Sequence, residues 1–214
     1  MNTGDDHMST RDRIFEAAVD LFSTRGYHGT SIREIAREVG IKESSIYNHF
    51  PGKDGILEAI LEYYQEGFRT ATSSLEEMEE FMKGFSEPVE LWLAVGVEFI
   101  KKLPPYTEPI SRILINEMFL DERCRRFVLH TMFTAQKEAA ENSLRYLRDR
   151  GLIRDCDIRQ TAVQYVYMLQ GLDIENRLMR MEGHSPEELQ QHLMDTIRFF
   201  IEGLRKNNTE RGKK

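Results

Sequence analysis

Apolar residues recur at three- and four-residue spacing along most of the chain, and strict alternation of apolar and polar positions is rare. This period is typical of amphipathic α-helices that turn one apolar stripe toward a core. Glycine and proline are sparse, with 14 and 6 among 214 residues, and nearly every segment between them carries this helical period. The pattern therefore predicts an all-α protein without strands.

The first three predicted helices are short and have clear boundaries. Thr10 is the expected N-cap of the first helix, and Gly26 stands where a C-cap glycine belongs. Ser31 and Glu34 have the spacing of a capping box, which predicts that a second helix begins there and ends at Gly40. The apolar faces of these two helices are Ile14, Phe15, Ala18, Leu21 and Phe22, then Ile32, Ile35, Ala36 and Val39.

The third helix follows after Ile41 and completes a predicted helix-turn-helix. Ala36 is small where two helices cross closely, Gly40 permits a left-handed turn, and Ile46 anchors the next helix. An ordinary helical hairpin inside a bundle is the alternative. That alternative leaves the short neutral polar side chains of the third helix unexplained, whereas such side chains suit base edges in the major groove of DNA.

Residues 10–57, TRDRIFEAAVDLFSTRGYHGTSIREIAREVGIKESSIYNHFPGKDGIL, resemble the N-terminal DNA-binding domain of the TetR family of transcriptional regulators. The similarity covers about a quarter of the chain, and the remainder matches the family only in helical character and length. It rests on Ala-x-x-Leu-Phe in the first helix, Gly26-Tyr27, Thr30-Ser31, Ile35-Ala36, Gly40-Ile41, Tyr47, His49-Phe50, Lys53 and Leu57.

The resemblance implies a homodimer that places two recognition helices in successive major grooves of a palindromic operator. Tyr47 and His49 would mainly contact phosphates. Lys42 departs from the Ser or Thr that more often caps this helix, and the acidic Glu43 must turn to solvent or to a cytosine amino group. The DNA-binding residues implied by the resemblance are Thr30, Lys42, Ser44, Ser45, Tyr47, Asn48, His49 and Lys53.

The charge balance limits how this surface can bind DNA. The net charge of the chain is −7, and residues 8–56 contain seven basic and seven acidic side chains. Binding through general basic excess is thereby disfavoured. We expect affinity to depend on dimerisation and on a few well-placed contacts, with a modest salt dependence.

The predicted domains are a helix-turn-helix domain at 8–56, a helical effector-binding and dimerisation domain at 57–206, and a disordered tail at 207–214. A helix from Lys53 to about Ser73 connects the first domain to the second. Beyond it, one long helix is expected from Asp121 to Arg150, and two further helices at about 157–181 and 186–205.

The middle of the chain is rich in aromatic and methionine side chains of the kind that line adaptable apolar cavities. A regulator that resembles this family would use this region as an inducer pocket, and we expect a hydrophobic or aromatic ligand. The alternative is that these residues form plain core. The apolar candidates are Trp92, Phe99, Tyr106, Met118, Phe119, Met132 and Phe133, and the polar candidates are Arg112, Asn116, Glu117 and His130.

The last two helices have broad apolar stripes that are difficult to cover within one subunit. We expect them to pair with their symmetry mates in a four-helix interface, and a purely internal core is the alternative. The predicted interface residues are Tyr165, Leu169, Leu172, Leu189, Leu193, Ile197, Phe200 and Leu204.

No other pattern predicts catalysis, a metal or a cofactor. Cys124 and Cys156 lack metal-type spacing, and Pro186 places His184 before a helix rather than on one face with His192. Phosphate-binding loops, nucleophile elbows and HExxH are absent from the sequence, so an enzyme is not expected. The polar N-terminus and the lack of an 18-residue apolar run favour a cytoplasmic protein that does not enter a membrane.

Two function classes remain. The favoured one is a ligand-responsive DNA-binding regulator, most simply a repressor that an effector releases from its operator. The other is a helical small-molecule carrier or sensor whose N-terminal part mediates only protein contacts.

Overall fold

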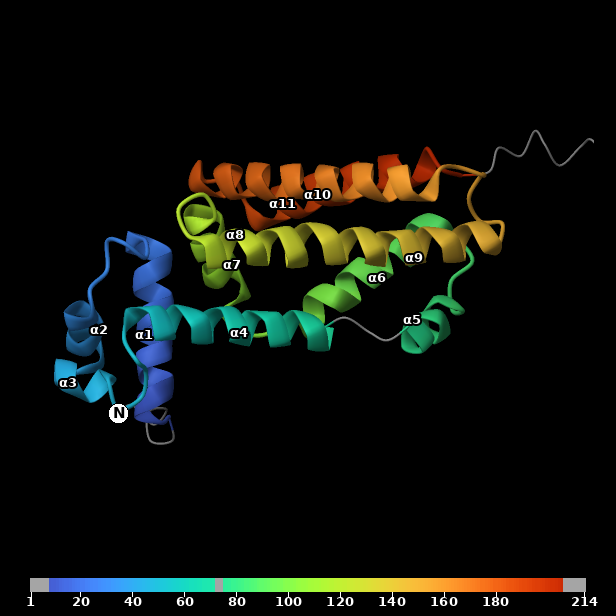
Figure 1. Cartoon of the computed structure of the whole chain (residues 1–214). Helices are drawn as coiled ribbons and strands as arrows, with labels where there is room; N and C mark the ends of the chain where they lie inside the picture. Colours follow the sequence, from blue (N-terminus) through green and yellow to red (C-terminus); the bar gives the residue numbers. More distant parts are fainter. Residues whose placement is uncertain (1–7, 72–74, 206–214) are drawn as a thin grey trace, which may run out of the picture. The chain divides into compact units, whose positions relative to one another are not determined.

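The computed structural model describes residues 8–71 and 75–205 (Figure 1), and within these ranges the chain is helical. The all-α prediction is confirmed, since the described residues form no strand and contribute only an isolated bridge between Ile153 and Arg205. The elements are α1 Thr10–Arg25, α2 Ile32–Val39, α3 Glu43–Ile46, α4 Lys53–Ala71, α5 Leu75–Met82, α6 Pro88–Lys102, α7 Thr107–Glu117, α8 Glu122–Phe127, the π-helical η1 Val128–Ala135, α9 Gln136–Asp149, α10 Ile158–Met181 and α11 Pro186–Glu202.

The described residues pack into two compact units. We call the part up to Ala71 together with Lys102–Thr131 the N-terminal unit, and residues 75–101 together with 132–205 the C-terminal unit. This division differs from the expected boundary after residue 56, which falls inside α4. Helix α4 stays with the first unit because its side chains Ile56, Leu57 and Ile60 are fully buried there. The expected tail at 207–214 lies outside the described residues.

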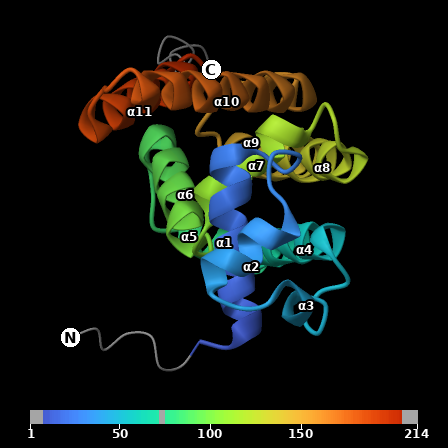
Figure 2. The same cartoon turned by 90° about the vertical axis from the view of Figure 1, so that its left-hand side faces the viewer.

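The N-terminal unit is built around α1, which contacts α2, α4 and α7 (Figure 2). Its buried face carries Ile14, Ala18 and Phe22, each with no exposed surface, as the periodicity predicts. The N-cap of α1 is Ser9 rather than Thr10, because the Ser9 hydroxyl accepts a hydrogen bond from the Asp12 backbone N–H at 3.2 Å. Thr10 is instead the first residue of the helix.

The long helix expected from Asp121 to Arg150 is present but not uniform. Asp121 caps its start by accepting backbone N–H bonds from Arg123 and Cys124 at 2.8 and 3.3 Å. Its middle, η1, has the wider winding of a π-helix, which the sequence does not predict.

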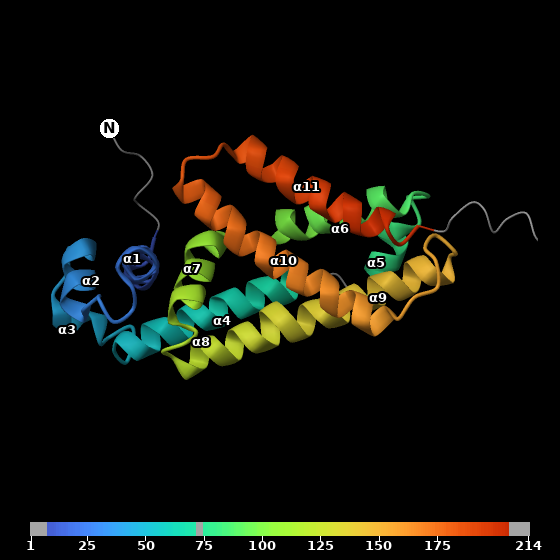
Figure 3. The same cartoon turned by 90° about the horizontal axis from the view of Figure 1, so that it is seen from above.

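The C-terminal unit places α10 between α9 and α11 (Figure 3). Its core gathers apolar side chains from α6, α9, α10 and α11, including Leu91, Leu144, Val166 and Ile201. No helix among the described residues has both the length and the apolar run needed to cross a bilayer.

Candidate nucleic-acid interface

Helices α2 and α3 form the expected helix-turn-helix. The capping box at the start of α2 is confirmed, since the Glu34 N–H donates to the Ser31 hydroxyl and Glu34 Oε2 accepts from the Ser31 N–H, at 3.3 and 2.8 Å. Gly40 takes the left-handed conformation at φ 76° and ψ 30°, and the Ile41 N–H donates to the Ala36 carbonyl at 3.0 Å. This turn directs the chain from α2 into α3.

Only part of the recognition segment is helical. Helix α3 contains only Glu43–Ile46, and the following residues form turns in which the N–H groups of His49 and Phe50 both donate to the Ile46 carbonyl at 2.9 Å. Ile46 and Phe50 are buried and anchor the segment at both ends. Lys42 is the N-cap of α3, and its side chain makes no capping hydrogen bond.

The residues around these anchors expose polar side chains. Lys42, Ser44, Asn48 and His49 are exposed, Ser45 is half-buried, and Tyr47 keeps 56% of its surface. Hydroxyl, amide, imidazole and ammonium groups are the donors and acceptors that proteins present to base edges and phosphates. Residues 42–49 thus form an accessible polar surface on a fixed support, which we call the recognition surface.

Thr30 and Lys53 are placed differently from the prediction. Thr30 is 2% exposed, and its hydroxyl donates to the Gly26 carbonyl at 3.0 Å. The Lys53 ammonium donates to the carbonyls of Tyr27 and Thr30 at 2.8 and 2.9 Å and lies 4.3 Å from the centre of the Tyr27 ring. Both side chains therefore bind within the subunit, and neither belongs to the recognition surface.

Three arginines that the sequence does not single out lie on α1 and α2. The Arg11 guanidinium stacks 4.8 Å from the centre of the Phe50 ring, at the end of the recognition surface. Arg33 and Arg37 are exposed on α2. The only sequence signal for Arg11 was a basic residue in the first turn of a helix that precedes a helix-turn-helix.

The residue that joins α1 to the recognition helices, Tyr27, is itself held in place. Its hydroxyl donates to Asp54 Oδ1 at 2.8 Å. Burial and the hydrogen bond to Asp54 raise the pKa of Tyr27 to about 12, so the phenol remains a donor at neutral pH.

The ligand-binding candidates are distributed over both units. Trp92, Phe99, Met132 and Phe133 belong to the C-terminal unit, where Trp92 is buried edge-on against Tyr165 with ring centres 4.9 Å apart. In the N-terminal unit Glu117 is buried, Met118 is half-buried, Phe119 is 78% exposed and Arg112 pairs with Glu108 at 2.8 Å. Tyr106, Asn116 and His130 are also at the surface of that unit.

The predicted dimer residues face mainly the core of their own unit. Leu172, Leu189, Ile197 and Leu204 are between 6% and 8% exposed, and Tyr165, Leu169, Leu193 and Phe200 are half-buried. A different set is accessible on α10 and α11. We call it the outer stripe, and its members are Tyr167, Ile174, Leu178 and Met181 on α10 and Phe199 on α11, with exposures of 56%, 50%, 57%, 82% and 81%.

The outer stripe follows one side of α10, since positions 167, 174, 178 and 181 are separated by seven, four and three residues. Gly171 lies on the same side and has open space where a Cβ would be. A groove of about 510 Å³ also lies in this unit, lined by Asn176, Arg180, His184, Pro186, Leu189, Gln190 and Leu193.

The histidines considered as metal ligands each lie against a single carboxylate. His184 lies 3.3 Å from Glu188, and His192 lies 3.2 Å from Glu175. Throughout the described ranges, no three His, Cys, Asp or Glu side chains are grouped so that they could hold a metal ion.

Residues 14–60 match the family model described as bacterial regulatory proteins, tetR family. A Bacillus subtilis protein described as the probable HTH-type transcriptional regulator YttP is 39% identical over 72 residues, which are 32% of this chain and 35% of that protein. The HTH-type transcriptional repressor KstR2 of Mycolicibacterium smegmatis is 33% identical over 90 residues, which are 38% of this chain and 44% of that protein. The chain thus aligns with less than half the length of these two relatives.

The fold is similar over a greater length. The crystal structure of a TetR-family transcriptional regulator from Cytophaga hutchinsonii aligns with a TM-score of 0.65 at 15% sequence identity, covering 95% of this chain and all of that one. These three similar proteins are transcriptional regulators and not enzymes, in agreement with the expectation from the sequence.

Proposed function

Because residues 14–60 match the model of the tetR family of bacterial regulatory proteins, we propose that the chain is a transcriptional repressor which binds a palindromic operator as a homodimer. A small hydrophobic or aromatic effector would release it from the DNA. The observation that carries the proposal is the exposed recognition surface supported by buried Ile46 and Phe50. The relative from Mycolicibacterium smegmatis, which is named a repressor, supports the direction of regulation.

In this proposal the recognition surface enters the major groove. Ser44 and Asn48 offer the hydroxyl and amide groups that read base edges, while Lys42, Tyr47 and His49 reach phosphates. Arg11 is a further cation at the end of this surface. The DNA contacts do not include the side chains of Thr30 and Lys53, which bind carbonyl groups inside the subunit.

Dimerisation would bury the outer stripe of α10 and α11. In a two-fold dimer each member of the stripe is buried twice, once in each subunit. Gly171 would allow close approach of the two α10 helices, since no side chain stands there. We therefore assign the interface to the outer stripe in place of the inward-facing residues that periodicity alone selected.

The effector would bind the C-terminal unit, where Trp92 is buried and Phe99 and Phe133 are half-buried. A dimer has two recognition surfaces. A ligand that binds more tightly when these surfaces are arranged unfavourably for DNA lowers operator affinity by the difference between its affinities for the two arrangements. Coupling of about 1 to 3 kcal/mol between two such sites changes DNA affinity by one to two decades.

The test begins with the full chain and a pool of random duplex DNA, from which bound sequences are selected and their affinity measured by fluorescence anisotropy. Tyr47→Ala combined with Asn48→Ala should weaken binding of the selected sequence at least tenfold, because the base contact of Asn48 contributes about 1 to 3 kcal/mol and the phosphate contact of Tyr47 is lost as well. Helical content and dimerisation should stay unchanged.

Gln65→Ala, an exposed amide truncation on α4, is the matched control and should bind DNA like the unaltered protein. If selection enriches no sequence, or if the double variant binds as well as the control, the repressor proposal fails. The carrier with a protein-binding N-terminal part would then be the better description.

A further inference from the structure

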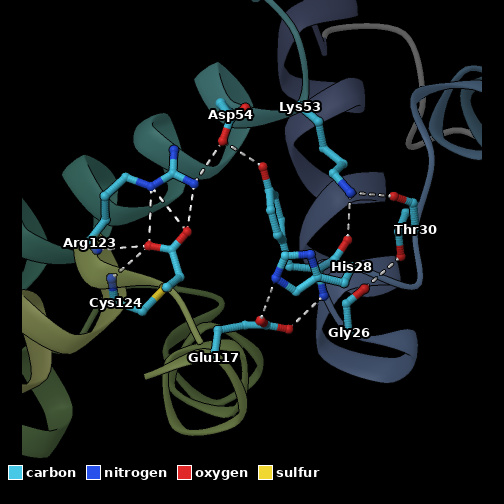
Figure 4. Close-up of polar contacts among 10 residues, drawn as sticks. Gly26, His28, Thr30, Lys53, Asp54, Glu117, Arg123 and Cys124 are labelled. Carbon is cyan, nitrogen blue, oxygen red and sulfur yellow. Dashed lines mark hydrogen bonds and ion pairs between the residues drawn. The ribbon is translucent and has the colours of Figure 1, made fainter. Parts of the chain in front are cut away.

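The segment Gly26–Thr30 connects α1 to α2 and is contacted by residues far away in the sequence (Figure 4). Glu117, the last residue of α7, accepts a hydrogen bond from the Tyr27 backbone N–H through Oε1 at 2.9 Å. Its second oxygen, Oε2, lies 3.7 Å from His28 Nε2. This carboxylate is only 4% exposed. Its Oε1 accepts the Tyr27 N–H, whereas its Oε2 has no hydrogen-bond partner among the described residues, so the cost of burying it is compensated only in part.

A second contact comes from Arg123 in α8. Its guanidinium donates to Asp54 Oδ1 at 2.8 Å, and the same oxygen accepts the Tyr27 hydroxyl. Asp121 fixes the arginine from behind with bonds of 2.7 to 3.3 Å, and Glu58 lies 3.6 Å away. Figure 4 shows Arg123 and Asp54 on one side of the segment and Glu117 on another, next to His28 of the segment itself.

Tyr27 is thereby held at three chemically different points. Glu117 binds its N–H, Lys53 binds its carbonyl, and Asp54, supported by Arg123, binds its hydroxyl. All of these residues belong to the N-terminal unit. Because the chain passes from this tyrosine into α2 within five residues, the position of Tyr27 determines where α2 and the recognition surface begin.

We propose that Glu117 and Arg123 are positioning residues for DNA binding, which set operator affinity by fixing Tyr27 although they lie outside the helix-turn-helix. The proposal rests on the repressor function above. It assigns the end of α7 and the start of α8 to the DNA-reading part of the molecule. Both residues act through hydrogen bonds and ion pairs within the protein.

The experiment measures operator affinity of the full-length dimer as a function of salt. Arg123→Gln and Glu117→Ala should each weaken binding about tenfold, within the 5- to 150-fold range usual for energetic coupling between sites. Glu117→Gln should restore most of the affinity, because its amide oxygen can still accept the Tyr27 N–H. Arg126→Gln is the matched control, since this arginine of α8 is 66% exposed and pairs with Glu122 at 3.7 Å.

The salt dependence separates positioning from direct contact. Loss of a phosphate contact lowers the slope of log affinity against log salt by about 0.9, which is the expected result for Lys42→Gln. Arg123→Gln should lower affinity with the slope nearly unchanged. A slope reduced by about 0.9 in Arg123→Gln, or an affinity equal to that of Arg126→Gln, would overturn the proposal.

A milder pair of variants covers the case in which Glu117→Ala does not fold. Tyr27→Phe removes only the hydroxyl, which donates to the same Asp54 oxygen as Arg123. The effects of Tyr27→Phe and Arg123→Gln on affinity should be non-additive because the two residues act through one carboxylate. Additive effects contradict the inference. Failure of the unaltered protein to select any DNA is a different result, which removes the repressor function itself.

Discussion

The outer stripe permits a quantitative prediction about assembly. Ile174 and Leu178 lie on one side of α10 and are 50% and 57% exposed in the subunit. Complete burial of such a side chain contributes about 1.5 to 3 kcal/mol, so covering the exposed half contributes about 1 kcal/mol. A two-fold dimer contains each residue twice, which gives about 4 kcal/mol for the four side chains.

Replacing both residues by alanine, Ile174→Ala with Leu178→Ala, should therefore raise the dimer dissociation constant by two to three decades, at about 1.4 kcal/mol per tenfold. The measurement is sedimentation equilibrium over a wide range of protein concentration. Far-UV circular dichroism of the diluted variant should show unchanged helicity, because neither side chain belongs to the subunit core.

The control is Val97→Ala with Ile100→Ala on α6, which removes side chains of similar exposure, 43% and 59%, from the same unit. This variant should dimerise like the unaltered protein. An unchanged dissociation constant in the α10 variant, or an equal rise in the α6 variant, refutes the assignment of the interface to the outer stripe. A larger loss from Leu189→Ala with Ile197→Ala, without loss of subunit stability, would favour the face that periodicity selected.

Three further predictions concern stability and reactivity. Gly40→Ala should lower the free energy of unfolding in urea by about 1 kcal/mol, because φ is 76° while the space for a Cβ is open, so only backbone strain is added. The Arg123 guanidinium holds the pKa of the Asp121 carboxyl below its usual value. The ionised Asp121 therefore contributes its full stabilisation above the ordinary pKa of about 3.9, and this stabilisation is lost as pH falls through the lower pKa of the folded state. Asp121→Asn should accordingly unfold with a weaker pH dependence in that acid range, as followed by thermal denaturation. Burial raises the pKa of the Cys124 thiol to about 12, so iodoacetamide at pH 8 should modify half-buried Cys156 and spare Cys124. The modified cysteine is identified by mass spectrometry of the folded protein, and modification of Cys124 in place of Cys156 would contradict this reasoning.

Local signals in the sequence were sufficient to predict the helix-turn-helix. The capping box of Ser31 and Glu34 and the left-handed Gly40 depend on residues within four positions of one another, so their geometry follows from short-range chemistry. The anchors Ile46 and Phe50 also follow from spacing, since they are the main apolar side chains of the segment.

The length of α3 and the role of Lys53 could not be predicted in the same way. Lys53 binds the carbonyls of Tyr27 and Thr30, which are 26 and 23 positions away and become acceptors only when the α1–α2 segment folds against α4. A lysine at the start of a helix next to a predicted DNA-binding surface looks like a phosphate ligand in sequence. Its actual partners are visible only in three dimensions.

Helix α10 shows why periodicity and burial select different candidate dimer faces. Its inward residues, such as Val166 and Leu172, and its outward residues, such as Ile174 and Leu178, are all apolar, so the helix has two apolar sides. Periodicity shows that one side is in excess but does not tell which side α9 and α11 cover, because that depends on how three helices pack. The apolar side of α10 that stays exposed is the candidate surface for assembly, and it can be identified only when burial within the subunit is known.

The same reasoning applies to Glu117, which was considered as a group that orients a ligand. A carboxylate next to aromatic and methionine residues in sequence suggests a pocket, yet its partner is a backbone N–H 90 positions away. A buried carboxylate needs hydrogen-bond donors to offset the loss of water, and the Tyr27 N–H is such a donor because no helix carbonyl accepts it after the turn at Gly26. The composition of the sequence around Glu117 does not reveal this donor. The contact with Tyr27 is the basis for proposing that Glu117 supports the recognition surface, and its effect on DNA affinity can be measured without any knowledge of the effector.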